Sequence, residues 1–179
     1  YVARCGNFKN AGFKYTGALK VLKVIMSYEY LWQNIRVLGG AYGCMSGFDR
    51  SGDAYFVSYR DPHLSQTDDI YEKIPEYLKG FDVDDRDMVK YIIGTFSSMD
   101  TPLTPSARGA RSRAAYFTGL TIERLRAERN EVLNTSVADI RALAPLVSSV
   151  LDSKCFCVIG DENAIEENAE KFENVRVLK

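Results

Sequence analysis

The hydrophobic and polar positions follow a strand-like period at the start of the chain and a helix-like period after it. Residues 1–9 alternate as a β-strand does, and Gly12 marks the following turn. Residues 16–34 are almost entirely apolar apart from a few regularly spaced polar positions, which predicts a mostly buried helix. We expect this helix to end before Arg36, because the glycines at 39 and 40 favour backbone shapes closed to other residues.

A β-hairpin is predicted next. Residues 42–48 and 54–59 are rich in aromatic and β-branched side chains, and the glycine-containing turn 49–53 that joins them has hairpin length. The Asp61-Pro62 step is expected to stop the second strand.

Five helical stretches are predicted after the hairpin. Each begins at a residue that can cap a helix, namely Ser65, Asp84, Thr104, Thr121 and Ser136. Pro75 and Pro145 lie inside two of these helices and should bend or shorten them, because each proline removes a backbone hydrogen bond.

The end of the chain predicts a short buried strand at 155–159, a brief acidic helix capped by Asp161, and a final strand at 175–177. The resulting order of elements predicts an α+β fold, with a largely antiparallel sheet and helices packed on one face. A chain of 179 residues suits one hydrophobic core, so we expect residues 1–179 to form a single domain.

Composition and charge exclude several classes of partner. The formal net charge is -1, so no positive field gathers nucleic acid or an anionic membrane surface. The longest apolar runs, such as residues 24–26, fall far short of the roughly 20 residues that a membrane span needs. We therefore expect neither nucleic acid nor a membrane as a partner.

The four cysteines predict reduced, buried thiols. Cys5, Cys44, Cys155 and Cys157 lack the C-x-x-C spacing of zinc ribbons and thioredoxin-like sites, and core packing is favoured over a metal or redox role. Free thiols suit a reducing compartment, so we expect a cytoplasmic location, or an organellar matrix if a transit peptide precedes the chain.

Catalytic signatures are largely missing from the sequence. His63 is the only histidine, so neither H-E-x-x-H nor the inverted H-x-x-E-H motif can be formed, and a self-contained zinc hydrolase is excluded. We interpret His63 as a surface or loop-bracing residue. Residues 39–43 are glycine-rich but run into a strand without the Lys-Ser/Thr pair of a phosphate loop.

Two groups of polar residues remain open to interpretation. Arg108, Arg111 and Arg113 lie at helical spacing and predict a solvated face or an interdomain ion-pair surface, with an acidic-peptide channel as the alternative. Arg36 stands six residues before Tyr42, across the two glycines. Spacing alone favours a cation near a helix C-terminus followed by an ordinary strand aromatic.

A resemblance to a known family changes this balance. Residues 31–43 (LWQNIRVLGGAYG), 58–62 (SYRDP) and 69–71 (DIY) resemble the C-terminal part of the presequence protease branch of M16 peptidases, and residues 92–95 and 135–137 continue the match in order. The chain departs from that family's pattern at Asp68, where an apolar residue is expected.

The resemblance implies that four related α+β domains, of the M16 metallopeptidase/LuxS-like type, form two halves that close around a peptide. The first domain carries zinc on an inverted H-x-x-E-H motif, and this chain resembles the last. Arg36 and Tyr42 match an arginine and a tyrosine that reach that zinc site to position substrate and stabilise its carbonyl. Gly39 and Gly40 would let the backbone approach the bound substrate.

The function implied by the resemblance is therefore that of a non-catalytic C-terminal domain in a zinc metalloendopeptidase that degrades unfolded peptides. Its partners would be the N-terminal half of the same polypeptide and the peptide substrates. The parent would bind zinc, whereas this segment would bind no metal and cut nothing alone. Two alternatives remain: a domain of an inactive M16 homologue that acts as a scaffold or peptide-presenting partner, and a free-standing peptide-binding module. An intact H-x-x-E-H upstream would favour the enzyme.

Overall fold

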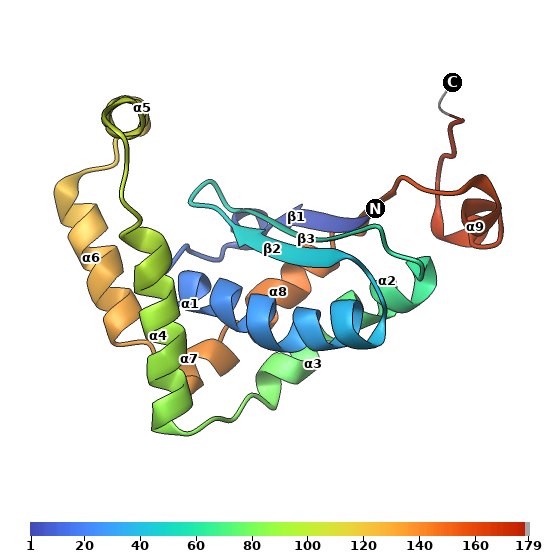
Figure 1. The fold of residues 1–179 in the computed structure, drawn as a ribbon, viewed down its shortest axis with the longest axis horizontal. Coiled ribbons are helices and arrows are strands. Elements are labelled where there is room, and N and C mark those ends of the chain that lie inside the picture. Colours follow the sequence, from blue (N-terminus) through green and yellow to red (C-terminus); the bar gives the residue numbers. More distant parts are fainter. Residues whose placement is uncertain (178–179) are drawn as a thin grey trace.

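A four-stranded sheet forms one layer of the computed structural model, which describes residues 1–177 (Figure 1). The strands are ordered β2-β3-β1-β4, and all three neighbouring pairs are antiparallel. Their bounds are Val2–Asn7 for β1, Gly43–Phe48 for β2, Asp53–Tyr59 for β3 and Cys155–Val158 for β4. The predicted hairpin is confirmed, with Phe48 opposite Ala54.

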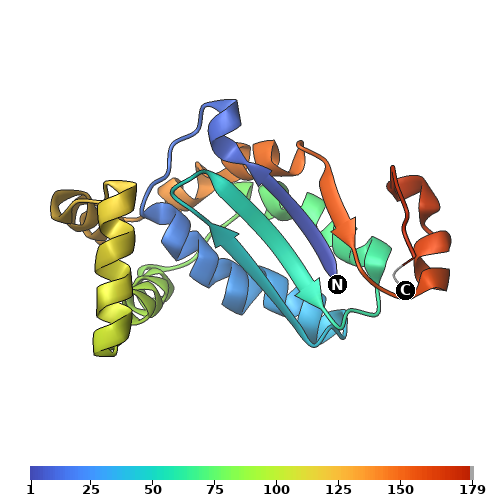
Figure 2. The same ribbon diagram turned by 90° about the horizontal axis from the view of Figure 1, so that it is seen from above.

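Helices cover one face of this sheet. The bounds are Ala18–Ile25 for α1, Leu64–Glu72 for α2, Ile74–Lys79 for α3, Asp85–Met99 for α4, Pro105–Thr118 for α5, Ile122–Leu133 for α6, Val137–Arg141 for α7, Ala144–Leu151 for α8 and Glu162–Glu166 for α9. Two short 3-10 helices are Phe8–Ala11 and Ala169–Lys171. Seen from above, the opposite face of the sheet is free of helices (Figure 2). The α+β prediction is confirmed.

The core lies between the sheet and the layer that contains α1, α3 and α8 (Figure 1). Alternation along β3 buries Ala54 and Phe56 against the helices and leaves Tyr55 exposed on the open face. In the other layer, Leu22, Ile25 and other apolar side chains of α1 are buried. No helix within residues 1–177 is long and apolar enough to cross a membrane.

The predicted caps at Asp84, Thr104, Thr121 and Ser136 are confirmed, since each side chain accepts a hydrogen bond from a first-turn N–H. Ser65 is not a cap, because α2 begins at Leu64. The Asp61 carboxylate orders this turn instead, by accepting hydrogen bonds from the His63 N–H and the Thr67 hydroxyl.

The two prolines divide helices instead of bending them. Pro75 lies in the first turn of α3 and Pro145 in the first turn of α8, where a missing N–H leaves no hydrogen bond unmade. Each predicted long helix is therefore two shorter ones.

The first long helix extends further than predicted. It passes from α1 into two π-helical segments, Met26–Tyr30 and Trp32–Leu38, so Arg36 lies inside the helix and not beyond its end. Leu31 and Ile35 are fully buried in this extension, and their burial holds the added turns against the sheet.

The predicted final strand at 175–177 is wrong. These residues have no regular structure, and Val175 and Val177 are exposed. After β4 the chain leads away from the sheet into α9, and residues 175–177 pair with no described strand (Figure 1).

The prediction of buried thiols is also wrong for three of the four cysteines. All four are free, but Cys5, Cys155 and Cys157 are exposed and Cys44 is half-buried. The cause is the sheet topology: β4 is an edge strand, and the alternation of β1 and β4 points these three side chains to the open face.

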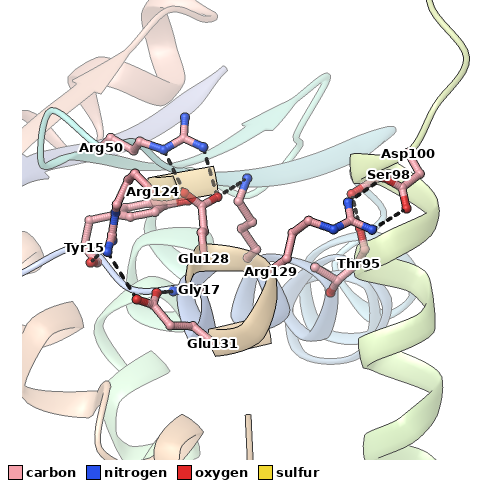
Figure 3. A network of polar contacts seen from close by, with 11 residues as sticks. Tyr15, Gly17, Arg50, Thr95, Ser98, Asp100, Arg124, Glu128, Arg129 and Glu131 are labelled. Atoms are coloured by element: carbon pink, nitrogen blue, oxygen red, sulfur yellow. Dashed lines mark hydrogen bonds and ion pairs between the residues drawn. The ribbon is translucent and has the colours of Figure 1, made fainter. Parts of the chain in front are cut away.

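A buried carboxylate joins α6 to the sheet and to α1 (Figure 3). The Glu128 side chain is only 1% exposed and accepts two hydrogen bonds from Arg50, at 2.8 and 3.0 Å. Lys20 Nζ lies 3.1 Å from Glu128 Oε1. One carboxylate therefore links α6, the β2–β3 turn and α1.

A second buried charge cluster explains why Asp68 departs from the expected apolar residue. Asp68 on α2 pairs with Lys171 at 3.0 Å and with Arg4 of β1 at 3.5 Å, and Arg4 also pairs with Glu72. Lys171 belongs to the C-terminal segment after β4. Asp68 therefore helps to hold that segment against α2 and the sheet.

Candidate functional site

The candidate site lies where the long helix ends and β2 begins. Arg36 is in the second π-helical segment, one residue after the buried Ile35, and its own side chain is exposed. π turns are rare and often occur at functional sites. The helix is thus held by its inner face and presents Arg36 on its outer face.

Two glycines end this helix for different backbone reasons. Gly39 is buried, and a β-carbon there would lie 2.6 Å from the Ile35 carbonyl oxygen. Gly40 has a φ of 75°, in the left-handed region that favours glycine, and its N–H donates to the Arg36 carbonyl at 3.1 Å. Only Pro62 lies within 4 Å of a β-carbon built at Gly40, so the exposed side of this turn is open.

The Arg36 side chain is held on two sides. Its guanidinium lies over the Trp32 ring, 4.2 Å from the centroid, and its Nε donates to the Tyr42 carbonyl oxygen at 3.1 Å. A guanidinium carries five N–H donors, and within residues 1–177 the two terminal nitrogens have no hydrogen-bond partner. Arg36 thus joins the helix end to the residue before β2 and keeps free donors.

Tyr42 stands immediately before β2 and is 60% exposed. Its ring centroid lies 5.6 Å from that of Tyr59, and the Arg60 guanidinium lies 5.2 Å from the Tyr42 ring. The Tyr42 N–H donates to the Arg60 carbonyl at 3.3 Å. In the described part of the chain its hydroxyl has no hydrogen-bond partner, so this phenol is available to a ligand.

The neighbouring strands support this arrangement. Gly43 lies opposite Tyr59, and a β-carbon at Gly43 would be 2.5 Å from the Tyr59 ring. The glycine therefore lets the Tyr59 ring lie across β2, beside Tyr42. Arg60 has a φ of 48°, which is uncommon for a residue with a side chain and turns the backbone sharply after β3.

Asp61 fixes the turn that carries Arg60. Its carboxylate accepts hydrogen bonds from the hydroxyls of Ser58 and Thr67, at 2.5 and 2.7 Å, and from the His63 N–H at 2.9 Å. His63 is exposed and supplies its backbone to this turn.

An open depression of about 470 Å³ adjoins Gly40. Its lining residues are Tyr1, Gly40, Arg60, Asp61, Pro62 and Gly160. The exposed side of the helix end therefore borders this open depression.

The arrangement brings together Arg36, Gly40 and Tyr42 of the four predicted site residues on an exposed surface, whereas Gly39 is buried beneath them. Sequence reasoning missed Tyr59. The hairpin pattern contains the signal that finds it, because pairing Phe48 with Ala54 places residue 59 opposite Gly43.

Potential metal ligands were compared across residues 1–177. Within residues 1–177 there is no group of three or more His, Cys, Asp or Glu side chains that could hold a metal ion.

The arginine stripe lies apart from this site. Arg108, Arg111 and Arg113 are exposed on α5, which contributes no residue to the core. Arg111 lines a cleft with Arg126 and Arg129, next to the Glu128 network.

The antiparallel sheet with helices on one face defines an α+β domain. The chain belongs to the PreP C-terminal domain family, whose family model matches residues 1–161. The Asp68 departure and the Arg36–Tyr42 surface both lie inside the matched range.

Curated relatives match nearly the whole chain. It is 43% identical over 176 residues to "Protein HypA" of Clostridium perfringens, covering 98% of this chain and 18% of that protein. It is 38% identical over 183 residues to "Presequence protease 1, chloroplastic/mitochondrial" of Arabidopsis thaliana, covering 99% of this chain and 17% of that protein. The chain thus spans less than a fifth of the length of these relatives.

A solved structure from Bordetella pertussis Tohama I, described as a zinc protease, has the same fold. It matches with a TM-score of 0.61 and 16% identity, over 83% of this chain and 88% of that one.

Proposed function

We propose that this chain is the last, non-catalytic domain of a zinc metalloendopeptidase that hydrolyses unfolded peptides. In this proposal the zinc site belongs to the N-terminal half of the same polypeptide, and Arg36 and Tyr42 reach substrate bound there. The observation that carries the proposal is the exposed pairing of Arg36 with the Tyr42 backbone, which leaves both side chains with unused hydrogen-bond donors.

Tyr42 is suited to stabilise charge on a peptide carbonyl. Its hydroxyl would donate a hydrogen bond to the scissile or a neighbouring carbonyl oxygen, which becomes more negative during hydrolysis. The packing of the Tyr42 ring beside Tyr59 and Arg60 supports this role, because it limits the positions that the hydroxyl can occupy. One such donor contributes on the order of 3 kcal/mol in hydrolases.

Arg36 is suited to hold the peptide in register. Its two free terminal nitrogens can bind a peptide carbonyl or a carboxylate through parallel hydrogen bonds. Trp32 and the Tyr42 carbonyl already restrain the guanidinium, so binding costs less side-chain entropy than it would for a free arginine.

The helix end provides room for a peptide backbone. Gly40 is exposed and has no side chain, and the depression beside it is open. Gly39 acts beneath this surface, where its lack of a β-carbon lets the helix close. Both glycines therefore support the approach of a substrate, one directly and one through the backbone.

The parent protein would act in a reducing compartment. The Arabidopsis relative is named as chloroplastic/mitochondrial, which suits an organellar matrix for some members of the family. We therefore propose a cytoplasmic or organellar-matrix location for the parent protein. The net charge of -1 favours neither nucleic acid nor an anionic membrane as a partner.

The test is Tyr42→Phe in the full-length protein. We expect kcat/KM for a fluorescent peptide of about 20 to 30 residues to fall roughly 100-fold, with zinc content and circular dichroism unchanged. Tyr59→Phe is the matched control, because it removes the hydroxyl of the ring next to Tyr42, which lies over Gly43. An unchanged kcat/KM in Tyr42→Phe would remove Tyr42 from the mechanism, and an inactive wild-type protein would favour a scaffold or peptide-presenting role.

A further inference from the structure

Three exposed thiols lie together on the open face of the sheet. Cys5 on β1 is directly opposite Cys155 on β4, and Cys157 is opposite Ala3, so all three side chains point to the same face. The Sγ atoms of Cys5 and Cys155 are 3.0 Å apart.

The strand register sets this pair at a distance that a disulfide can span. Tyr1 and Ile159 exchange both backbone hydrogen bonds, at 2.9 and 3.0 Å. Cys5 and Cys155 lie four residues along from that pair, so they occupy the same type of position, where α-carbons are about 5.5 Å apart. Disulfides join α-carbons about 4.4 to 6.8 Å apart.

We propose that Cys5 and Cys155 are a redox-sensitive modification site, which a small-molecule disulfide such as glutathione disulfide oxidises to a reversible cross-strand disulfide. This site is independent of the proposed peptidase role. Directly opposed β-carbons are about 4.5 to 5.5 Å apart, slightly more than the 3.5 to 4.5 Å usual in disulfides. The bond is therefore strained and exposed, and such bonds are readily reduced again.

The chemistry begins at Cys155. The hydrogen bond with Cys155, followed by partial burial, raises the pKa of the Cys5 thiol to about 11, so Cys5 is protonated at neutral pH. Cys155 gives its proton to water, and its thiolate attacks one sulfur of glutathione disulfide, which breaks that S–S bond, forms a mixed disulfide and releases one glutathione thiolate. That thiolate takes the Cys5 proton.

The Cys5 thiolate then attacks Cys155 Sγ and releases the second glutathione as a thiolate, which takes up from water the proton that Cys155 released. Overall, two protein thiols are oxidised to one disulfide. One glutathione disulfide is reduced to two glutathione thiols, which carry the two thiol protons.

Formation of the Cys5–Cys155 disulfide would change how the C-terminal part of the chain is held. β4 is a four-residue edge strand that leads into α9 and the segment anchored by Lys171. A covalent bond between β1 and β4 would prevent this edge strand from separating from the sheet.

The test is disulfide mapping of the full-length protein, treated in its folded state with glutathione disulfide and then blocked with an alkylating reagent. Trypsin cuts after Arg4 and Lys154, so Cys5 falls in the peptide 5–9, and Cys155 and Cys157 fall in the peptide 155–171. We expect these two peptides to be linked, and the link to disappear when the protein is reduced before alkylation.

The matched variants identify the partner of Cys5. Cys157→Ser is expected to keep the link, and Cys155→Ser is expected to lose it. Absence of the link in the folded wild-type protein would overturn the proposal, as would a link that survives in Cys155→Ser. A link that resists millimolar reduced glutathione would refute its reversibility.

Discussion

The Glu128 network offers the sharpest test of how α6 is attached. Glu128→Gln keeps the size of the side chain and removes its charge, while Arg50 and Lys20 keep theirs. The amide also presents N–H donors where the carboxylate accepted hydrogen bonds from both cations. The variant therefore faces two cations with one fewer acceptor.

The expected loss of unfolding free energy in Glu128→Gln follows from the burial of the three side chains. Removing one partner of a buried ion pair costs about 3 to 5 kcal/mol. The Glu128 side chain is 1% exposed, but those of Arg50 and Lys20 are 41% and 28% exposed, so water replaces part of the lost interaction. We expect the free energy of unfolding to fall by about 2 to 3 kcal/mol, and Tm by roughly 5 to 10 °C.

The effect should depend on pH in a defined direction. Burial raises the pKa of Glu128, but the hydrogen bonds and charges of Arg50 and Lys20 outweigh it and hold the pKa below its ordinary value of 4.5. A carboxylate with a depressed folded pKa contributes stability above its unfolded pKa and loses it as pH falls through the folded value. The difference between wild type and Glu128→Gln should thus be full at pH 7 and shrink below pH 4.5.

Urea unfolding of the 179-residue chain, followed by far-ultraviolet circular dichroism at pH 7 and below pH 4.5, measures both quantities. Glu123→Gln is the control on the same helix, where an exposed first-turn carboxylate contributes only about 0.3 to 1 kcal/mol. Equal losses in the two variants, or a loss in Glu128→Gln that does not shrink in acid, would refute the ion-pair reasoning.

Two other predictions concern the helix end and the C-terminal segment. Gly40→Ala places a β-carbon at a φ of 75° and should lower the free energy of unfolding in urea by about 1 to 2 kcal/mol. The control Gly109→Ala, at an open position in α5, should not destabilise the protein. Equal unfolding midpoints for the two variants would contradict this reasoning. Lys171→Met removes an anchor of the C-terminal segment and should speed chymotrypsin cleavage at Phe172 several-fold, as timed by mass spectrometry. The control is the exposed Lys79→Met, and cleavage at the wild-type rate in Lys171→Met would show that the anchor is dispensable.

Most of the fold could be predicted from the sequence, because helix caps and hairpin turns depend on residues that are close together in the chain. The Ser136 capping box and the hairpin turn at 49–53 depend on residues a few positions apart, and both are present. The prolines were assigned to helices correctly, but the sequence does not reveal that the chain restarts a helix at Pro75 and Pro145. Whether a proline bends a helix or begins one depends on packing of the preceding turn.

The exposed cysteines could not be predicted in the same way. The run 155–159 is apolar and appears buried by composition, yet a strand at the edge of a sheet with one open face exposes every second side chain. That outcome depends on strand order, which is set by contacts about 150 residues apart in the chain. The same limit applies to the predicted final strand, because residues 175–177 have a suitable composition but pair with no described strand.

The candidate site depends both on residues that the sequence identifies and on long-range contacts that it does not reveal. The resemblance identified Arg36 and Tyr42, but their geometry depends on the π-helical turns and on Gly43, which no propensity reveals. A regular helix ending before Arg36 would have left that side chain on a loop, where ordering it against a substrate costs up to about 2 kcal/mol of rotamer entropy. In the structure Trp32 and the Tyr42 carbonyl restrain it without a ligand. The extra helical turns are therefore the feature that turns two exposed polar residues into a prearranged surface.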